Sequence, residues 1–237
     1  MTFYGFQKTS LINFPNKISS VVFTSGCNFH CPYCHNPELV NETCRQVYPE
    51  DFILNHLKKQ KGKIEGLCIT GGEPLIYGEN LLNFIDKVKS IDIKVKLDTN
   101  GSFPEFLKKA NVDYIAMDIK SSLSKYNLFS KDCSIIEKMN LIEKIKESIH
   151  YIINSNIDYE FRTTVVPNLV TLDDIKIICR DLIVNSKNYY LNQFRSQITL
   201  DESYCGLKSY SDSVLEEMKN ICNKHNIPCT IRNNYAI

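Results

Sequence analysis

The sequence predicts an α/β fold in which a parallel sheet with outer helices curves into a partial (βα)6-type TIM-like barrel. Three observations lead to this prediction. Apolar, β-branched runs alternate with helical patterns along the chain, and serial βα units imply parallel strands joined by right-handed crossovers. Six units are fewer than the eight of a closed barrel. Unusual residues follow nearly every expected strand, whereas the alternative, a flat doubly wound sheet, gathers its site at one switch point.

The first four strands follow from short apolar runs that end at turn residues. ISSVVFT, at 18–24, is rich in β-branched residues and ends at Ser25-Gly26. The helix at 49–62 has Pro49 and two acids in its first turn and ends at Gly62, which are common helix boundaries. The expected strands are 18–24, 64–70, 93–98 and 112–119, and the expected helices between them are 49–62, 79–89 and 104–110.

The second half of the chain continues the alternation. A long helix is indicated by apolar residues that recur every three or four positions, at Ile135, Met139, Ile142, Ile145, Ile149 and Ile152. The helix at 171–184 opens with Thr171 and Asp174 at capping-box spacing, and the last helix, at 213–225, opens with Ser213 and Glu216 at the same spacing. The remaining strands are expected at 157–166, 188–194 and 228–231.

Length and composition fit one domain over 1–237, with a core of about 17–200 and a C-terminal helix and strand at about 211–232. A net charge of +1 indicates no bulk attraction to nucleic acid or to a membrane surface. The first residues lack a signal-peptide pattern and no apolar run is long enough to span a membrane. We therefore expect a cytoplasmic protein, whose ten cysteines are unlinked by disulfides. Cys68, Cys179 and Cys222 lie in apolar or helical patterns and are expected in the core.

One loop gathers three of these cysteines. SGCNFHCPYCHNPE, at 25–38, places Cys27, Cys31 and Cys34 at C-x3-C-x2-C spacing. Zinc would need a fourth ligand, which His30 or His35 could supply. A redox dithiol would use only two of the three thiols. A [4Fe–4S] cluster normally takes four thiolates, so three would leave one iron open to a ligand. The spacing favours the cluster and leaves the other two uses open.

The remaining unusual residues follow the later strands. Because parallel strands end at one edge of the sheet, all of them are expected to face one pocket together with the cysteine loop. They are Gly71-Gly72-Glu73-Pro74 after the second strand, Asp98-Thr99-Asn100-Gly101 after the third, Asp118 and Lys120 at the fourth, Arg162 in the fifth and Gln193 in the sixth.

Four motifs resemble, in the same order, those of the radical S-adenosylmethionine enzymes, and of glycyl-radical enzyme activating proteins in particular. They are CNFHCPYCHN at 27–36, GGEP at 71–74, LDTNG at 97–101 and MDIK at 117–120. The resemblance extends from about residue 8 to residue 195. The opening KTSLINFPNKISSVVFTSGCN is most similar to the anaerobic ribonucleoside-triphosphate reductase activating proteins.

This resemblance implies an oxidoreductase that works without oxygen. In the family the three cysteines, here Cys27, Cys31 and Cys34, hold a [4Fe–4S] cluster whose fourth iron binds the methionine end of S-adenosylmethionine. One electron, from a donor such as flavodoxin or ferredoxin, cleaves the cofactor to a 5′-deoxyadenosyl radical. The radical then removes the α-hydrogen of a glycine on a partner glycyl-radical enzyme. The cofactor carries the chemistry, so no acid or base residue is expected.

The resemblance also assigns cofactor-binding roles by position. Tyr33, between Cys31 and Cys34, matches an aromatic residue beside the adenine, and Cys34 and His35 after it are also expected to bind the cofactor. Gly71 and Gly72 allow a close approach of the backbone to the ligand. Polar residues near the cofactor, where some activating enzymes hold a monovalent cation, match Asp98, Thr99, Asn100 and Asp118. Lys120 could neutralise the cofactor carboxylate. The other expected residues are Glu73, Pro74, Arg162 and Gln193. Turn chemistry in DTNG, a solvated lysine and a polar barrel interior are the plain alternatives.

Two departures narrow the assignment. Cys44 and Cys68 are isolated, so no auxiliary cluster is expected, and YLNQFRSQ lacks the histidine that formate-lyase activators place near the sixth strand.

A radical enzyme acting on a small molecule or a peptide is the nearest alternative. A non-catalytic iron–sulfur electron carrier and a zinc-stabilised binding module are alternatives of other classes.

Overall fold

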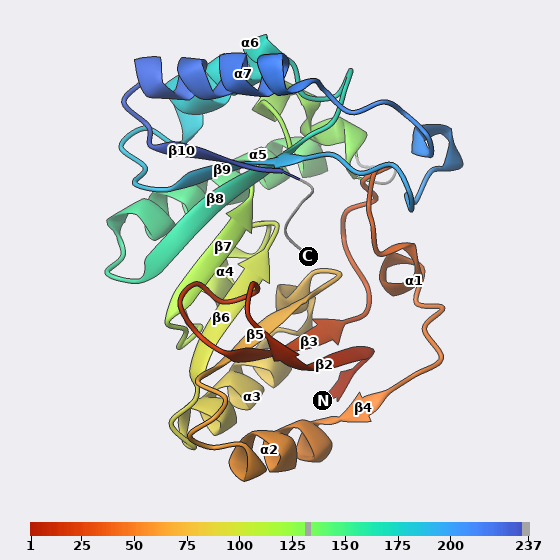
Figure 1. Cartoon of the computed structure of the whole chain (residues 1–237), viewed down its shortest axis with the longest axis vertical. Helices are drawn as coiled ribbons and strands as arrows, with labels where there is room; N and C mark the ends of the chain where they lie inside the picture. The colour runs from red at the N-terminus through yellow and green to blue at the C-terminus, as the bar shows by residue number, and fades with distance from the viewer. Residues whose placement is uncertain (131–133, 234–237) are drawn as a thin grey trace.

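The computed structural model describes residues 1–130 and 134–233, so Cys133 lies outside the described residues. Its main sheet has the strand order β10-β9-β8-β7-β6-β5-β3-β2, in which each parallel strand from β3 to β10 lies beside the next one along the chain (Figure 1). A sheet that advances in one direction is the arrangement of a barrel. The predicted partial barrel is confirmed, with β2 and β10 as its two edges.

The strands agree with the sequence pattern from β3 onward. Their bounds are β2 (Gly5–Ser10), β3 (Ser19–Thr24), β5 (Gly66–Gly71), β6 (Lys94–Thr99), β7 (Tyr114–Asp118), β8 (Asp158–Val165), β9 (Tyr189–Gln193) and β10 (Cys229–Arg232). A separate antiparallel pair joins β1 (Thr2–Phe3) to β4 (Tyr48–Pro49). β2, which runs antiparallel to β3, was not expected, since most of its side chains are polar and partly or fully exposed.

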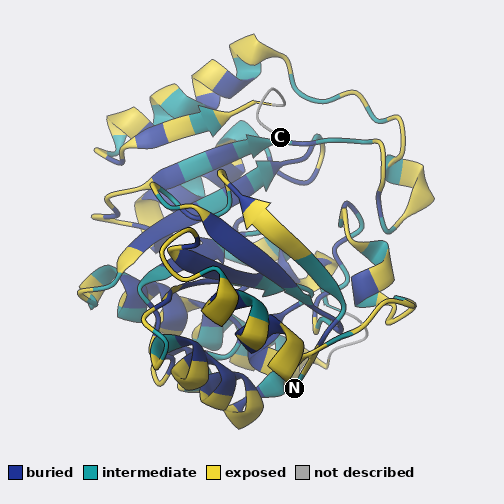
Figure 2. Cartoon of the chain, turned by 60° about the horizontal axis from the view of Figure 1, so that its bottom comes forward, coloured by how far each residue is buried: buried dark blue, intermediate teal, exposed yellow. Residues whose placement is uncertain are grey.

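Apart from the short helix at 37–40, which belongs to the cysteine loop, the helices lie outside the curve of the sheet (Figure 1). Buried residues fill the space between sheet and helices (Figure 2). The helices are α1 (Pro37–Val40), α2 (Glu50–Lys59), α3 (Glu79–Lys89), α4 (Pro104–Leu107), α5 (Ile135–Asn154), α6 (Leu172–Ile177) and α7 (Asp212–Lys224), with short turns η1 (Pro74–Tyr77), η2 (Leu123–Leu128), η3 (Ile178–Leu182) and η4 (Glu202–Tyr204). No helix in the described part of the chain is both long and apolar enough to cross a membrane.

Of the two predicted capping boxes, one is present in the structure and the other is not. The Thr171 hydroxyl accepts from the backbone N–H of Asp174, and the Asp174 carboxylate accepts from the backbone N–H of Thr171, which confirms the capping box of α6. The helix expected over 171–184 is shorter, because α6 passes into the wider turn η3. The Ser213–Glu216 box is wrong: α7 begins at Asp212, which puts Ser211 at the N-cap position and Ser213 inside the helix.

The apolar stripe of α5 is only half used. Ile145, Ile149 and Ile152 are buried against the sheet, as expected. Ile135 and Met139, in the first turns, are 78% and 63% exposed. The buried half of the helix is the half that packs in the core, and helix periodicity alone does not distinguish the two. The expected core cysteines Cys68, Cys179 and Cys222 are all buried.

Candidate functional site

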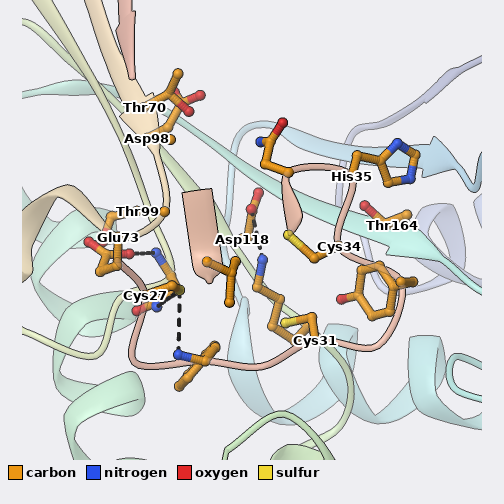
Figure 3. Close-up of a pocket in the computed structure, with 18 of the residues that line it drawn as sticks. Cys27, Cys31, Cys34, His35, Thr70, Glu73, Asp98, Thr99, Asp118 and Thr164 are labelled. Carbon is orange, nitrogen blue, oxygen red and sulfur yellow. Dashed lines mark hydrogen bonds and ion pairs between the residues drawn. The ribbon is translucent and has the colours of Figure 1, made fainter. Parts of the chain in front are cut away.

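A cavity of about 200 Å³ lies at the carboxyl ends of the strands, between the cysteine loop and β5–β8. Figure 3 shows the three thiols and the carboxylates of Glu73, Asp98 and Asp118 around it. Of the expected site residues, those lining this cavity are Cys27, Cys31, Tyr33, Cys34, His35, Gly71, Gly72, Glu73, Asp98, Thr99, Asn100, Asp118, Lys120 and Arg162. Most of the residues expected at the strand ends thus lie around one cavity.

Two expected residues lie elsewhere. Pro74 is buried at the first position of η1 and does not line the cavity. Gln193 lines a neighbouring cavity, and its side-chain amide donates to the carbonyl of Tyr210 at 3.2 Å. The cavity also contains residues that sequence reasoning missed, among them Thr70 and Thr164. Thr164 could have been found, because it stands two residues after Arg162 and so shares its face of the strand.

The cysteine loop is held by its backbone. The amide of Gly26 donates to Leu39 at 2.7 Å, and the amide of Cys34 donates to Cys31 at 3.0 Å in a tight turn. Burial raises the pKa of the Cys27 thiol to about 12 and that of Cys31 to about 11. Both are neutral thiols at neutral pH, and a soft metal centre would displace their protons on binding.

The thiols line one cavity without converging on one point. Among the described residues, no three His, Cys, Asp or Glu side chains are close enough together to hold a single ion. Neither His30 nor His35 therefore completes a tetrahedral zinc set with the cysteines in this arrangement. A four-iron cube is wider than a single ion, so its thiolate ligands stand farther apart.

Gly71 and Gly72 are required by close backbone contacts, Gly71 with the end of β3 at Thr24 and Gly72 with the cysteine loop at Gly26. Gly71 has φ +125°, and a Cβ atom on Gly72 would lie 1.8 Å from the carbonyl oxygen of Gly26. The amide of Gly72 donates to Thr24, and that of Glu73 donates to Gly26, each at 2.9 Å. The expected reason for the two glycines was a close approach to the ligand. The structure shows that they allow two backbone segments of the site to touch.

Glu73 joins the loops after β5 and β6. Its buried carboxylate accepts from the Thr99 hydroxyl at 2.8 Å and from the backbone amides of Asn100 at 2.6 Å and Leu75 at 3.1 Å. Burial raises the pKa of Glu73 to about 7, although these donors lower it. The Asn100 side chain in turn donates to the Asn28 side chain at 2.9 Å, in the cysteine loop. Glu73 and Asn100 thus fix three loops relative to one another.

A charged group forms the side of the cavity next to the barrel interior. Arg162 donates to Asp118 at 2.7 Å and to Asp98 at 3.2 Å, and Lys120 donates to Asp118 at 3.0 Å. Burial raises the pKa of Asp118, but Arg162 and Lys120 outweigh it and hold that pKa well below its usual range. Burial likewise lowers the pKa of Lys120, and Asp118 keeps it well above its usual value. All of these side chains are therefore charged at neutral pH.

A second cavity, of about 800 Å³, adjoins the first and leads toward the edges of the sheet. The two share His35, Asp98, Arg162 and Thr164. Ile12, Asn13 and Pro15, between β2 and β3, line one side of the second cavity, and Asn192, Gln193 and Arg195, at the end of β9, line the other. The site is thus reached through the open side of the barrel.

A profile of the Radical SAM superfamily matches residues 21–182. The chain is 31% identical over 225 residues to a predicted glycyl-radical enzyme activating enzyme from Methanocaldococcus jannaschii, which covers 93% of this chain and 91% of that one. It is 30% identical over 125 residues to pyruvate formate-lyase-activating enzyme from Clostridium pasteurianum, covering 49% and 51%. A solved radical SAM methyltransferase from Sphaerobacter thermophilus matches with TM-score 0.67 at 12% identity, over 94% of this chain and 68% of that one, which shows the fold alone.

The chain belongs to the radical SAM superfamily, whose members use a [4Fe–4S] cluster and S-adenosylmethionine. Within it, the chain belongs with the glycyl-radical enzyme activating enzymes. The side chains that line the cavity suit the chemistry of these two groups. It offers three thiols, which no other metal-binding side chain in the described part of the chain joins around one ion, and a cationic Lys120 and Arg162 for a carboxylate. It also offers a buried Tyr33, whose hydroxyl has no hydrogen-bond partner among the described residues.

Proposed function

We propose that this enzyme activates a glycyl-radical enzyme, with an anaerobic ribonucleotide reductase or a similar protein as its partner. A bound cluster and S-adenosylmethionine would supply the radical chemistry that removes the α-hydrogen of a glycine on the partner. The observation that carries the proposal is the pair of joined cavities: the thiols and the strand-end polar groups line the inner one, and the outer one opens at the side of the barrel.

The chain's own residues would position these groups. Cys27, Cys31 and Cys34 would be the ligands of the cluster. Lys120 and Arg162, the cations on the cavity wall, would hold the carboxylate of the cofactor, and Tyr33 would lie beside its base. Glu73 and the two glycines before it keep the loops in register, so they act on the cofactor through the backbone.

The outer cavity would receive the segment of the partner that carries the glycine. Its volume of about 800 Å³ lies within the range of ligand sites, about 300–1,000 Å³. Asn13 and Asn192 offer amide groups on its two sides, and such groups suit the backbone of an extended peptide. An enzyme for one small molecule, the alternative, would close this side around its substrate.

The proposal includes an electron donor such as flavodoxin or ferredoxin, and activity in the cytoplasm as one catalytic domain over 1–237. The donor and the compartment follow from the chemistry, because the cluster must receive one electron in reducing, oxygen-free surroundings.

The test is installation of the radical on a partner. Reconstituted, reduced enzyme and S-adenosylmethionine would be mixed without oxygen with an anaerobic ribonucleotide reductase or with pyruvate formate-lyase, and EPR spectra recorded. A glycine-centred radical that requires the enzyme supports the proposal. Release of 5′-deoxyadenosine with no glycine radical on either partner would overturn it. Cys34→Ser serves as the inactive control and Cys205→Ser, at an exposed thiol, as the active one.

A further inference from the structure

Lys96 is a charged side chain buried inside the barrel, and no expected role accounts for it. It stands on β6 two residues before Asp98, so both side chains point to the same face of the strand. Its side chain is only 3% exposed. The ammonium group contacts Oδ1 of Asp98 and lies 3.9 Å from the Cys68 sulfur. Burying a lysine ammonium costs free energy unless it is paired, so the burial of Lys96 depends on its contact with Asp98.

The neighbouring carboxylates have their oxygens occupied. Asp98 accepts from Lys96 on Oδ1 and from Arg162 on Oδ2, the latter at 3.2 Å. Asp118 accepts from Arg162 on Oδ1 at 2.7 Å and from Lys120 on Oδ2 at 3.0 Å. Each of the four oxygens therefore already faces a cation of the chain.

This arrangement does not fit the monovalent cation that the resemblance implied. Such an ion binds through oxygen ligands, and here the two carboxylates it would need are engaged by Lys96, Lys120 and Arg162. A third carboxylate, Glu160, lies 3.8 Å from Arg162 and pairs with Arg232 at 2.7 Å. Four side-chain cations thus face three carboxylates, and no carboxylate is left unpaired for a further cation. Burial raises the pKa of Asp98, and Arg162 and Lys96 bring it below its usual value, which keeps the carboxylate ionised.

We propose that Lys96 is a positioning residue that takes the place of the monovalent cation. Its ammonium group holds the Asp98 carboxylate at the wall of the cofactor cavity, so the enzyme binds S-adenosylmethionine without K⁺ or Na⁺. A tethered ammonium is always present at the site, whereas a free ion must first be bound and ordered. The inference rests on the cofactor and is independent of the partner that receives the radical.

The test measures S-adenosylmethionine affinity by calorimetry on reconstituted protein in KCl, NaCl and choline chloride at equal ionic strength. Wild-type affinity is expected to be the same in all three salts. Lys96→Met is expected to bind about tenfold more weakly in choline chloride, the value of one charge-assisted hydrogen bond. KCl or NaCl should restore its affinity, because an ion can then reach Asp98. Lys94→Met, at an exposed lysine of the same strand, is the control and should bind as wild type does.

Three results would overturn the proposal. Wild-type affinity that falls in choline chloride would show that an ion is needed. Lys96→Met with wild-type affinity would show that the ammonium is dispensable, and a weakened variant that no salt rescues would indicate a structural role only.

A second measurement covers the case in which Lys96→Met does not fold. Thermal unfolding of cluster-free wild-type protein should give the same midpoint in KCl and in choline chloride. A higher midpoint in KCl would reveal a bound cation and refute the proposal. Neither readout requires a glycyl-radical partner, so failure here is distinct from failure of the proposed function.

Discussion

The contact between Gly72 and the cysteine loop makes Gly72→Ala an informative perturbation. The added Cβ would lie 1.8 Å from the carbonyl oxygen of Gly26 and 2.6 Å from its carbon, and real Cβ atoms do not approach heavy atoms closer than 3.0 Å. The two segments must therefore separate by 1.2 Å, the difference between 3.0 and 1.8 Å. Both sides of the contact are backbone, so no side chain can move aside to absorb the change.

The expected cost falls mainly on activity. A misplacement of about 1 Å at a catalytic site costs about 100-fold in rate, and overpacking costs about 1–3 kcal/mol of stability. The assay is 5′-deoxyadenosine formed by reduced, reconstituted enzyme, with iron content and the thermal midpoint measured on the same sample. We expect a folded protein whose 5′-deoxyadenosine rate is about 100-fold lower.

The matched control is Gly206→Ala. A Cβ at Gly206 would meet no heavy atom within 4 Å, although Gly206 has φ +78°, so this variant isolates backbone strain from steric contact. It should lose about 1 kcal/mol of stability and keep its activity. Gly72→Ala with wild-type iron content and a rate within about threefold of wild type would refute the reasoning, since a shift of this size at the site should not be tolerated.

Three further predictions concern the metal ligands, a helix cap and a buried ion pair. Cys34→Ser should fail to retain iron after reconstitution, whereas Cys44→Ser should retain it; equal iron in both would contradict the ligand assignment. Thr171→Ala should lower the unfolding free energy in urea by about 1 kcal/mol, and Ser213→Ala by less than about 0.5 kcal/mol because it is not a cap; equal losses would restore the discarded capping box. Arg232→Met should lower the unfolding free energy by about 2 kcal/mol at pH 7, because it leaves the buried carboxylate of Glu160 without its bidentate partner. Burial raises the pKa of that glutamate, but its arginine partners bring it below its usual value in the folded state. The pair therefore stabilises the fold above the unfolded pKa, about 4.5, and the difference between variant and wild type should shrink as the pH falls through the lower folded value; a difference that stays constant from pH 7 to pH 3 in urea titrations would contradict this.

The sequence predicted the place of those side chains that stand at the carboxyl ends of parallel strands. Asp98 and Asp118 lie at the carboxyl ends of the adjacent parallel strands β6 and β7, so their meeting at one edge follows from topology. The contacts of Glu73 with Thr99 and Asn100 do not, because they depend on how two loops fold back after leaving the sheet. No spacing in the sequence specifies that geometry.

Other features were missed because local chemistry pointed elsewhere. Lys96 stands two residues before Asp98 in the same strand, so the two side chains share one face, and this spacing can be read from the sequence. A lysine is almost never fully buried unless it is paired, so the pattern alone favoured a surface position. β2 was missed because its exposed Gln7, Lys8 and Thr9 do not resemble a strand, and it is recognisable only by its pairing with β3.

The most direct test of the central claim is the EPR spectrum of anaerobically reconstituted, reduced protein with and without S-adenosylmethionine. We expect the signal of a reduced [4Fe–4S] cluster that changes when the cofactor is added, followed by release of 5′-deoxyadenosine. A colourless protein that retains zinc after the same treatment, or a cluster whose spectrum ignores the cofactor, would contradict the assignment of Cys27, Cys31 and Cys34 and the chemistry built on it.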